Sequence, residues 1–153
     1  MTDDLYKKMV LALPGDFFKD WQWHIGDKAL CLDSLSRGEV ILMEGICHGL
    51  VKVAWVDRIF LETEQECIDR LRPVPSQKQL QSIIKQHWLK SDDTVKDYDV
   101  LVFFQDWFRV RYGSSYTYGL RYKEIENESI DCIWLRYTMH VIYNKNWNGE
   151  AWI

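Results

Sequence analysis

The sequence predicts an α+β fold, in which a small antiparallel sheet over about residues 28–72 packs against a C-terminal set of helices. Between residues 28 and 72, short apolar runs are separated by turn residues, a pattern typical of strands. After Pro75, apolar residues recur at helical spacing. The chain has 153 residues, of which 47% are hydrophobic and 27% charged. This size and balance predict one globular domain spanning residues 1–153.

The N-terminal stretch is predicted to be a helix over residues 2–13. Thr2 can cap it, and Leu5, Met9 and Leu13 recur at every fourth position. Pro14-Gly15 then ends the helix. The aromatic-rich residues 16–23 fit either a second short helix or an aromatic plug under the sheet, and both alternatives remain open.

The sheet is predicted to be an antiparallel meander. We expect breaks at residues 34–38, 45–49 and 62–66, and we expect Pro73 and Pro75 to close the strand region because proline removes a backbone donor. The predicted strands are Lys28–Leu32, Glu39–Glu44, Leu50–Val56, Arg58–Leu61 and Ile68–Arg72.

Two helices are expected next. Ser76 and Gln79 form a capping box that begins the first, which extends through Trp88. Thr94 is the expected cap of the second, over residues 95–112, with a strand over 100–104 as the alternative. Residues 113–115 read as a loop, and residues 116–125 as a strand or an extended segment.

The last helix, over residues 129–144, is the predicted centre of the fold because it has two apolar flanks. Ser129 can cap it, and Asp131 suits the positive end of the helix dipole. One flank carries Ile130, Trp134, Tyr137 and Val141, and the other carries Cys132, Leu135, Met139 and Ile142.

Composition restricts the location and the class of protein. The formal net charge of -4 argues against a protein that coats nucleic acid non-specifically. The four cysteines are isolated and form no C-x-x-C pair. The N-terminus lacks a signal-peptide pattern, and no apolar run is long enough to span a membrane. We therefore expect a soluble, cytoplasmic protein with reduced thiols.

No catalytic, cofactor-binding or metal-binding pattern is present in the sequence. The four histidines lack metal-ligand spacing, and no phosphate-binding glycine loop or nucleophile elbow occurs. We expect no cofactor and no catalysis. Arg136 and His140 share a helix face that could bind an anion. The favoured interpretation is that this face either lies in solvent or caps neighbouring carbonyl groups.

Basic and aromatic residues alternate in two places, and this grouping can stack bases and neutralise phosphates. An amphipathic helix and a charged edge strand show the same pattern. The candidate nucleic-acid-binding residues are Arg109, Arg111, Tyr112, Arg121 and Lys123.

Three stretches resemble a group of small uncharacterised proteins encoded by phages and prophages of Gram-positive bacteria. Residues 75–81 carry P-x-Q-x-Q-L-Q, residues 145–152 carry K-x-W-N-G-E-x-W, and residues 129–135 lie between them, followed by Met139 and Tyr143. The resemblance implies an origin and no particular activity. Within the terminal motif, we expect Trp147 and Trp152 to dock on the core, with a turn at Asn148-Gly149 between them.

These observations favour an accessory phage protein that acts through contact with a protein partner. A nucleic-acid-associated phage factor is the alternative, and a metal-dependent enzyme is the third possibility. The partner and the oligomeric state are not specified by the sequence.

Overall fold

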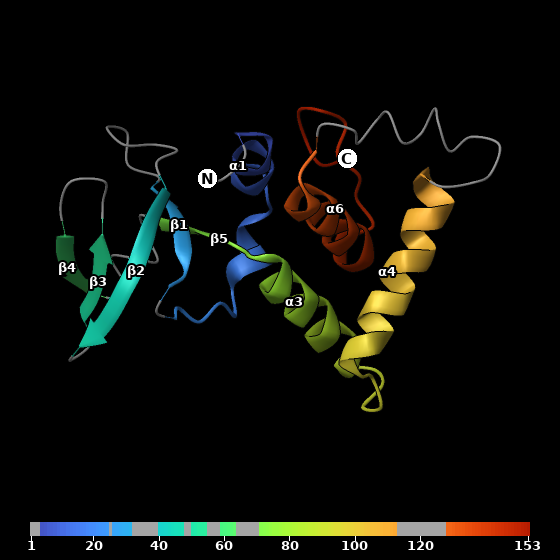
Figure 1. Ribbon diagram of the computed structural model, residues 1–153, viewed down its shortest axis with the longest axis horizontal. Helices are drawn as coiled ribbons and strands as arrows, with labels where there is room; N and C mark the ends of the chain where they lie inside the picture. Colours follow the sequence, from blue (N-terminus) through green and yellow to red (C-terminus); the bar gives the residue numbers. More distant parts are fainter. Residues whose placement is uncertain are drawn as a thin grey trace. The chain divides into compact units, whose positions relative to one another are not determined.

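A computed structural model describes residues 4–24, 26–31, 40–47, 50–54, 59–63, 71–112 and 128–153. The chain divides into two compact units, residues 1–75 and residues 76–153. The first contains the sheet, and the second contains three helices of thirteen to sixteen residues (Figure 1). The predicted α+β class is therefore confirmed, while the single domain stays a prediction.

The first unit contains a five-stranded sheet with the order β4-β3-β2-β1-β5, in which every neighbouring pair is antiparallel. The first four strands form the predicted meander. The last strand does not continue the meander beside the fourth strand. It pairs instead with the free edge of the first strand, β1, on the side away from β2. The strands are β1 (Lys28–Cys31), β2 (Val40–Cys47), β3 (Leu50–Ala54), β4 (Ile59–Thr63) and β5 (Leu71–Val74).

The expected breaks at residues 45–49 and 62–66 overlap strands, because β2 extends to Cys47 and β4 to Thr63. β2 continues through Gly45, where the register with β3 shifts by one residue, because glycine in a strand readily accommodates a bulge. β5 contains Pro73, which lies opposite Ala29. Because β5 is an edge strand with a single neighbour, Pro73 can be accommodated without a hydrogen bond to a second strand. The predicted end of the last strand at Arg72 is therefore two residues too early. The prediction that residues 73–75 close the strand region is confirmed, because β5 ends at Val74.

The N-terminal helix α1 (Asp4–Leu11) confirms the first predicted element. Its Tyr6 hydroxyl donates a hydrogen bond of 2.5 Å to the carbonyl of Pro75, just beyond β5. A single turn of 3₁₀ helix, η1 (Gly15–Phe18), follows. Edge-to-face ring contacts then link Phe18 to Trp21 and Trp21 to Trp23. The structure thus contains the short helix of the first alternative at Gly15–Phe18, and the rings that follow it contact one another.

The second unit contains α3 (Gln77–Leu89), α4 (Asp97–Tyr112) and α6 (Ile130–Tyr143). The capping box of Ser76 and Gln79 is present at the start of α3, as predicted. α4 begins at Asp97 rather than Val95, and it is a helix where a strand was the alternative. Thr94 does not cap it, because the Thr94 hydroxyl and amide both donate to Asp92 Oδ1. Residues 113–127, including the expected loop and extended segment, lie outside the described residues.

α6 is the most completely buried of these helices. Ser129 caps it by accepting a hydrogen bond from the amide of Cys132. Trp134 and Tyr137 on one flank and Leu135 and Met139 on the other are buried, which confirms both apolar flanks. Ile130 is half exposed, so the first flank begins one turn later than expected. Thr138 is also buried, and its hydroxyl donates a hydrogen bond to the carbonyl of Trp134.

The C-terminal segment folds back on itself after α6. Asn144 ends the helix in the left-handed conformation with φ 53°. Trp147 and Trp152 form an isolated antiparallel bridge, and both side chains are buried with ring centroids 5.1 Å apart. The Asn148 side chain accepts hydrogen bonds from the amides of Glu150 and Ala151. The docking of both tryptophans around a turn at Asn148 is confirmed.

Candidate functional site

Helix α4 starts in an acidic segment of the second unit. The amide of Lys96, just before the helix, donates to Asp99 at 2.7 Å, and Asp97 forms a 2.7 Å ion pair with Lys85 on α3. The hydrogen bond and charge of Lys85 lower the pKa of Asp97. Hydrogen bonds from Thr94 likewise lower the pKa of Asp92. The carboxylates of Asp92 and Asp97 therefore remain ionised at neutral pH. Asp97 lies in the first turn of α4, where the helix dipole favours negative charge.

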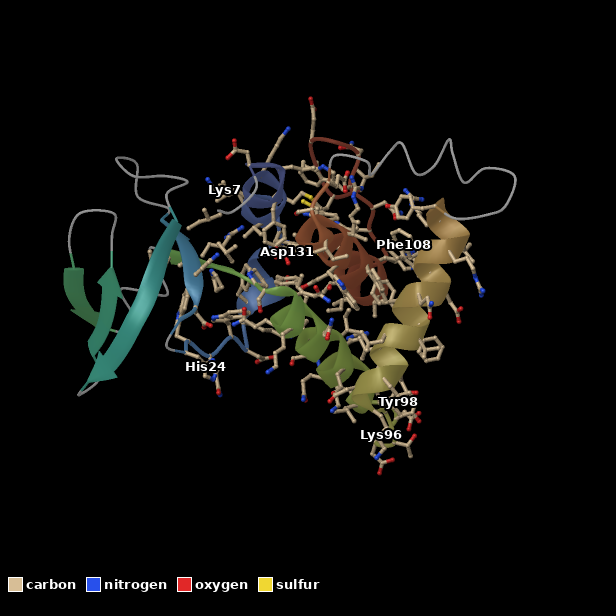
Figure 2. The ribbon with its side chains drawn as sticks, viewed as in Figure 1. Lys7, His24, Lys96, Tyr98, Phe108 and Asp131 are labelled. Atoms are coloured by element: carbon tan, nitrogen blue, oxygen red, sulfur yellow. The ribbon has the colours of Figure 1, made fainter. Side chains whose placement is uncertain are left out.

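The inner side of α4 contacts α6 through aromatic rings. Phe104 stacks on Trp134 with ring centroids 3.8 Å apart and an interplanar angle of 11°. The ring centroids of Trp107 and Tyr137 lie 5.1 Å apart. Phe108 packs on the buried cluster of Tyr112 and Ile133, and Figure 2 shows it on the side of α4 toward α6. Aromatic side chains thus anchor this half of the helix.

α4 also exposes large apolar side chains, which together we call the outer surface of α4. Tyr98, Phe103 and Val110 retain 65%, 55% and 71% of their accessible area. Leu101 and Val102 are each about half exposed and complete the surface. Figure 2 shows Tyr98 at the beginning of the helix. Single exposed apolar residues are ordinary, but five on one helix indicate a surface that can bind another molecule.

A hollow of about 530 Å³ adjoins the outer surface of α4 where the α3–α4 connection meets both helices. Trp88 and Phe103 line it, with ring centroids 5.4 Å apart in an edge-to-face arrangement. Asp92 and Asp99 supply two carboxylates to the same lining. Aromatic faces together with carboxylates favour a positively charged side chain as an occupant.

The candidate nucleic-acid residues are only partly brought together. Arg109 and Arg111 are exposed near the end of α4, and Arg109 forms a 2.9 Å ion pair with Asp106. Tyr112 is only 2% exposed and packs against Trp107 and Phe108. The ring therefore belongs to the core of the second unit, and a role of Tyr112 in nucleic-acid binding stays a prediction. Arg121 and Lys123 lie outside the described residues.

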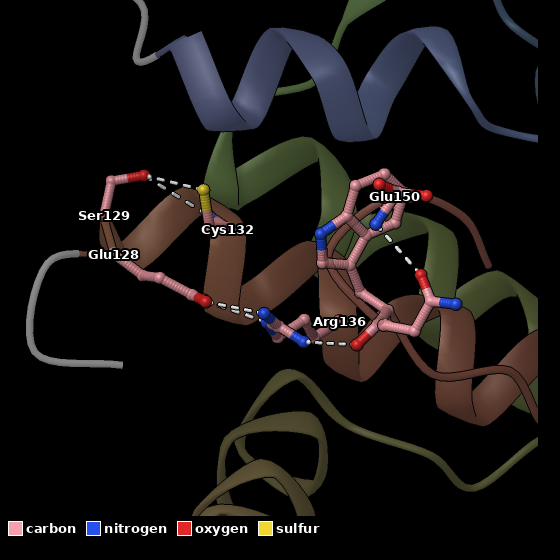
Figure 3. A network of polar contacts seen from close by, with 7 residues as sticks. Glu128, Ser129, Cys132, Arg136 and Glu150 are labelled. Carbon is pink, nitrogen blue, oxygen red and sulfur yellow. Dashed lines mark hydrogen bonds and ion pairs between the residues drawn. The ribbon is translucent and has the colours of Figure 1, made fainter. Parts of the chain in front are cut away.

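Arg136 has a structural partner within its own unit. Its guanidinium forms a two-point ion pair with Glu128 and donates to the carbonyl of Trp147 at 3.2 Å (Figure 3). Burial opposes its positive charge, but the hydrogen bonds and charge of Glu128 outweigh burial and raise the pKa of Arg136. Of the two favoured alternatives, Arg136 therefore follows the capping of a neighbouring carbonyl group and not exposure to solvent. The same geometry ties the terminal tryptophan segment to α6.

A second cavity, of about 250 Å³, lies in the first unit. Phe18, Trp21 and Trp23 line it together with Arg72 of β5. The Arg72 guanidinium is engaged in structure, because it donates to the carbonyls of Val10, Leu11 and Leu13 at the end of α1. These hydrogen bonds stabilise the C-terminal end of α1 and the two residues that follow it.

Sequence reasoning missed the outer surface of α4. Its signal was present, since apolar residues occur all around the circumference of residues 98–110 rather than on one stripe.

Within the described parts of the chain, no group of three or more metal-binding side chains occurs. Among those same residues, no helix is both long and apolar enough to cross a membrane. Comparisons with protein-family models, curated proteins and solved structures found no match to this chain.

Proposed function

We propose that this chain is a phage or prophage accessory protein that acts by protein–protein contact, without catalysis, through the outer surface of α4. The observation that carries the proposal is the exposure of Tyr98, Leu101, Val102, Phe103 and Val110 on this one helix. The resemblance of residues 75–81 and 145–152 to phage-encoded proteins supports the proposed origin.

Energetics favour a partner for this surface. Removing a side chain such as leucine or phenylalanine from water stabilises a complex by about 1.5–3 kcal/mol when burial is complete. α4 is held by its inner aromatic residues, so covering its outer side requires no rearrangement of Phe104 or Trp107. A preformed helix face avoids the entropic cost of ordering a flexible segment.

Site-specific photo-cross-linking tests the proposal directly. A photoreactive amino acid replaces Val102 in the full chain, and the matched control replaces Gln86, an exposed polar residue of α3 in the same unit. The cross-linking is carried out inside the cell that expresses the chain. We expect discrete cross-linked adducts from position 102 and none from position 86. Adding Leu101→Asp should abolish the adducts without changing the circular dichroism spectrum. Equal labelling at both positions would contradict the proposal.

Nucleic-acid association is the second proposal, favoured by the exposed Arg109 and Arg111 at the end of α4. Binding of labelled single- and double-stranded DNA should weaken steeply with salt, because phosphate contacts release counterions. Arg109→Ala should reduce the slope of that salt dependence by about one unit. Absence of binding at low salt would remove this alternative and leave the protein-contact proposal unaffected.

A further inference from the structure

We infer that the outer surface of α4 pairs with the same helix of a second copy of this chain, in antiparallel orientation. The inference rests on the proposed function, because it names the partner of the surface proposed there. Three features carry it: the distribution of charge along α4, the positions of its exposed apolar residues, and the hollow beside Phe103.

Charge is segregated along α4. Asp97 and Asp99 lie in its first turn, whereas Arg109 and Arg111 lie in its last turn. Such placement also suits the dipole of an isolated helix, so the charges alone have a local explanation. The exposed apolar residues between them have no such explanation. A helix surface that carries acidic residues at its beginning and basic residues at its end is complementary to itself when turned end for end.

The residue spacing agrees with a two-fold axis at the level of Phe104. Asp99 and Arg109 lie five residues before and after that level, so each copy places its arginine opposite the aspartate of the other. Tyr98 and Val110 lie six residues before and after it, and they are the two most exposed apolar residues of the helix. Antiparallel helix dipoles also attract one another.

The hollow provides a place for the incoming arginine. Its lining includes Asp99 together with the rings of Trp88 and Phe103. A guanidinium can pair with a carboxylate and lie over an aromatic face at the same time. Arg109 already pairs with Asp106 in its own chain, but that pair is largely exposed and contributes little, so exchange of partner costs little.

The expected dimer is weak. α4 has sixteen residues and is therefore about 24 Å long, so one helix pair buries less area than most stable interfaces. Sedimentation velocity of the full chain should show an average mass that rises with concentration from 18.3 kDa toward twice that value. A mass that stays at 18.3 kDa up to about millimolar concentration would overturn the inference.

Complementary charge reversal provides the sharpest test. Arg109→Glu and Asp99→Lys should each weaken self-association by about tenfold or more, because like charges then meet twice in each dimer. An equimolar mixture of the two variants should associate as the unmodified chain does, because every contact again joins opposite charges. If the mixture stays monomeric, or if either variant associates normally alone, the antiparallel pairing is wrong.

Folding of the variants is checked separately, because Asp99 also accepts the Lys96 amide. Val102→Asp is a second variant in which no such hydrogen bond is removed, and it should abolish the rise in mass while the melting temperature stays unchanged. A rise in mass that persists in this variant would overturn the inference.

The photo-cross-linked adducts from position 102 distinguish self-pairing from the proposed function in general. Adducts of twice the chain mass support self-pairing. Adducts of another mass, from a chain that stays monomeric, contradict self-pairing and leave the proposed function standing.

Discussion

Helices α4 and α6 are similar in length and both rich in aromatic residues, yet their surroundings differ. α6 buries seven of its fourteen side chains, whereas α4 buries two of its sixteen. Both supply rings to one contact, in which Phe104 stacks on Trp134. The comparison shows that aromatic content does not determine burial. α6 has neighbours on several sides, whereas α4 is anchored along one side and exposes the other.

The largest expected effect comes from removing the buried ring of that contact. Trp134→Ala should lower the free energy of unfolding by about 3–5 kcal/mol, because it leaves a cavity and removes the stacking of Phe104. Phe103→Ala on the outer side of α4 should cost less than about 1 kcal/mol. Urea unfolding measures both. Equal losses would show that the two helices do not differ in the way described.

Two arginine–carboxylate pairs sharpen the comparison. The Arg136–Glu128 pair on α6 is largely buried, whereas the Arg109–Asp106 pair on α4 is exposed. Arg136→Met should destabilise the chain by about 3 kcal/mol, because Glu128 and the Trp147 carbonyl lose their partner. Arg109→Met, the matched control, should change stability by less than about 0.5 kcal/mol. Chemical denaturation measures the free energy of unfolding of both variants. Equal losses would show that the buried pair contributes no more to stability than the exposed one.

Tyr137 on α6 predicts a dependence on alkaline pH. Burial, with a smaller effect of the Asp106 charge, raises the pKa of Tyr137 from 10.0 to about 12. The folded state therefore retains a proton that the unfolded state releases between pH 10 and 12. Its contribution of roughly 2–3 kcal/mol is complete below pH 10 and is lost as the pH rises through 12. Tyr137→Phe should flatten this part of the stability–pH curve, and an unchanged slope would contradict the assignment.

The smallest effect on stability is expected on the outer surface of α4. Val102→Asp should change the free energy of unfolding by no more than about 0.5 kcal/mol, because Val102 is half exposed and an added carboxylate stays in water. Gln86→Asp on α3 is the control for adding a charge to an exposed helix position. A thermal melt measures both. A large loss from Val102→Asp alone would mean that this surface contributes to the fold rather than to association.

Local signals in the sequence predicted several elements correctly. The capping box at Ser76 and the cap at Ser129 act within three residues, so their geometry is encoded locally. The alternation of turn residues and short apolar runs identified the strand region in the same way. The terminal turn was also predicted, because Asn148 supplies the side chain that accepts from the two amides following it.

Predictions that depended on distant neighbours were less successful. The last strand was expected to end at Arg72, but its pairing with β1 at the sheet edge extends through Val74. The sequence pattern also gave no sign that contacts with Trp107 and Phe108 bury the ring of Tyr112, a candidate nucleic-acid-binding residue. The hollow beside Phe103 also depends on how α3, the connection and α4 come together. None of these placements follows from the few residues on either side.

By itself, the sequence determined where most helices and strands form, because caps, turns and periodicity involve residues within one or two turns of each other. Tertiary structure alone decided which apolar sides are covered. α6 and α4 have comparable apolar residues, but burial depends on which elements approach each side, and that is a property of long-range packing. The exposed side of α4, on which the proposed function depends, was visible only once α4 was placed against α6.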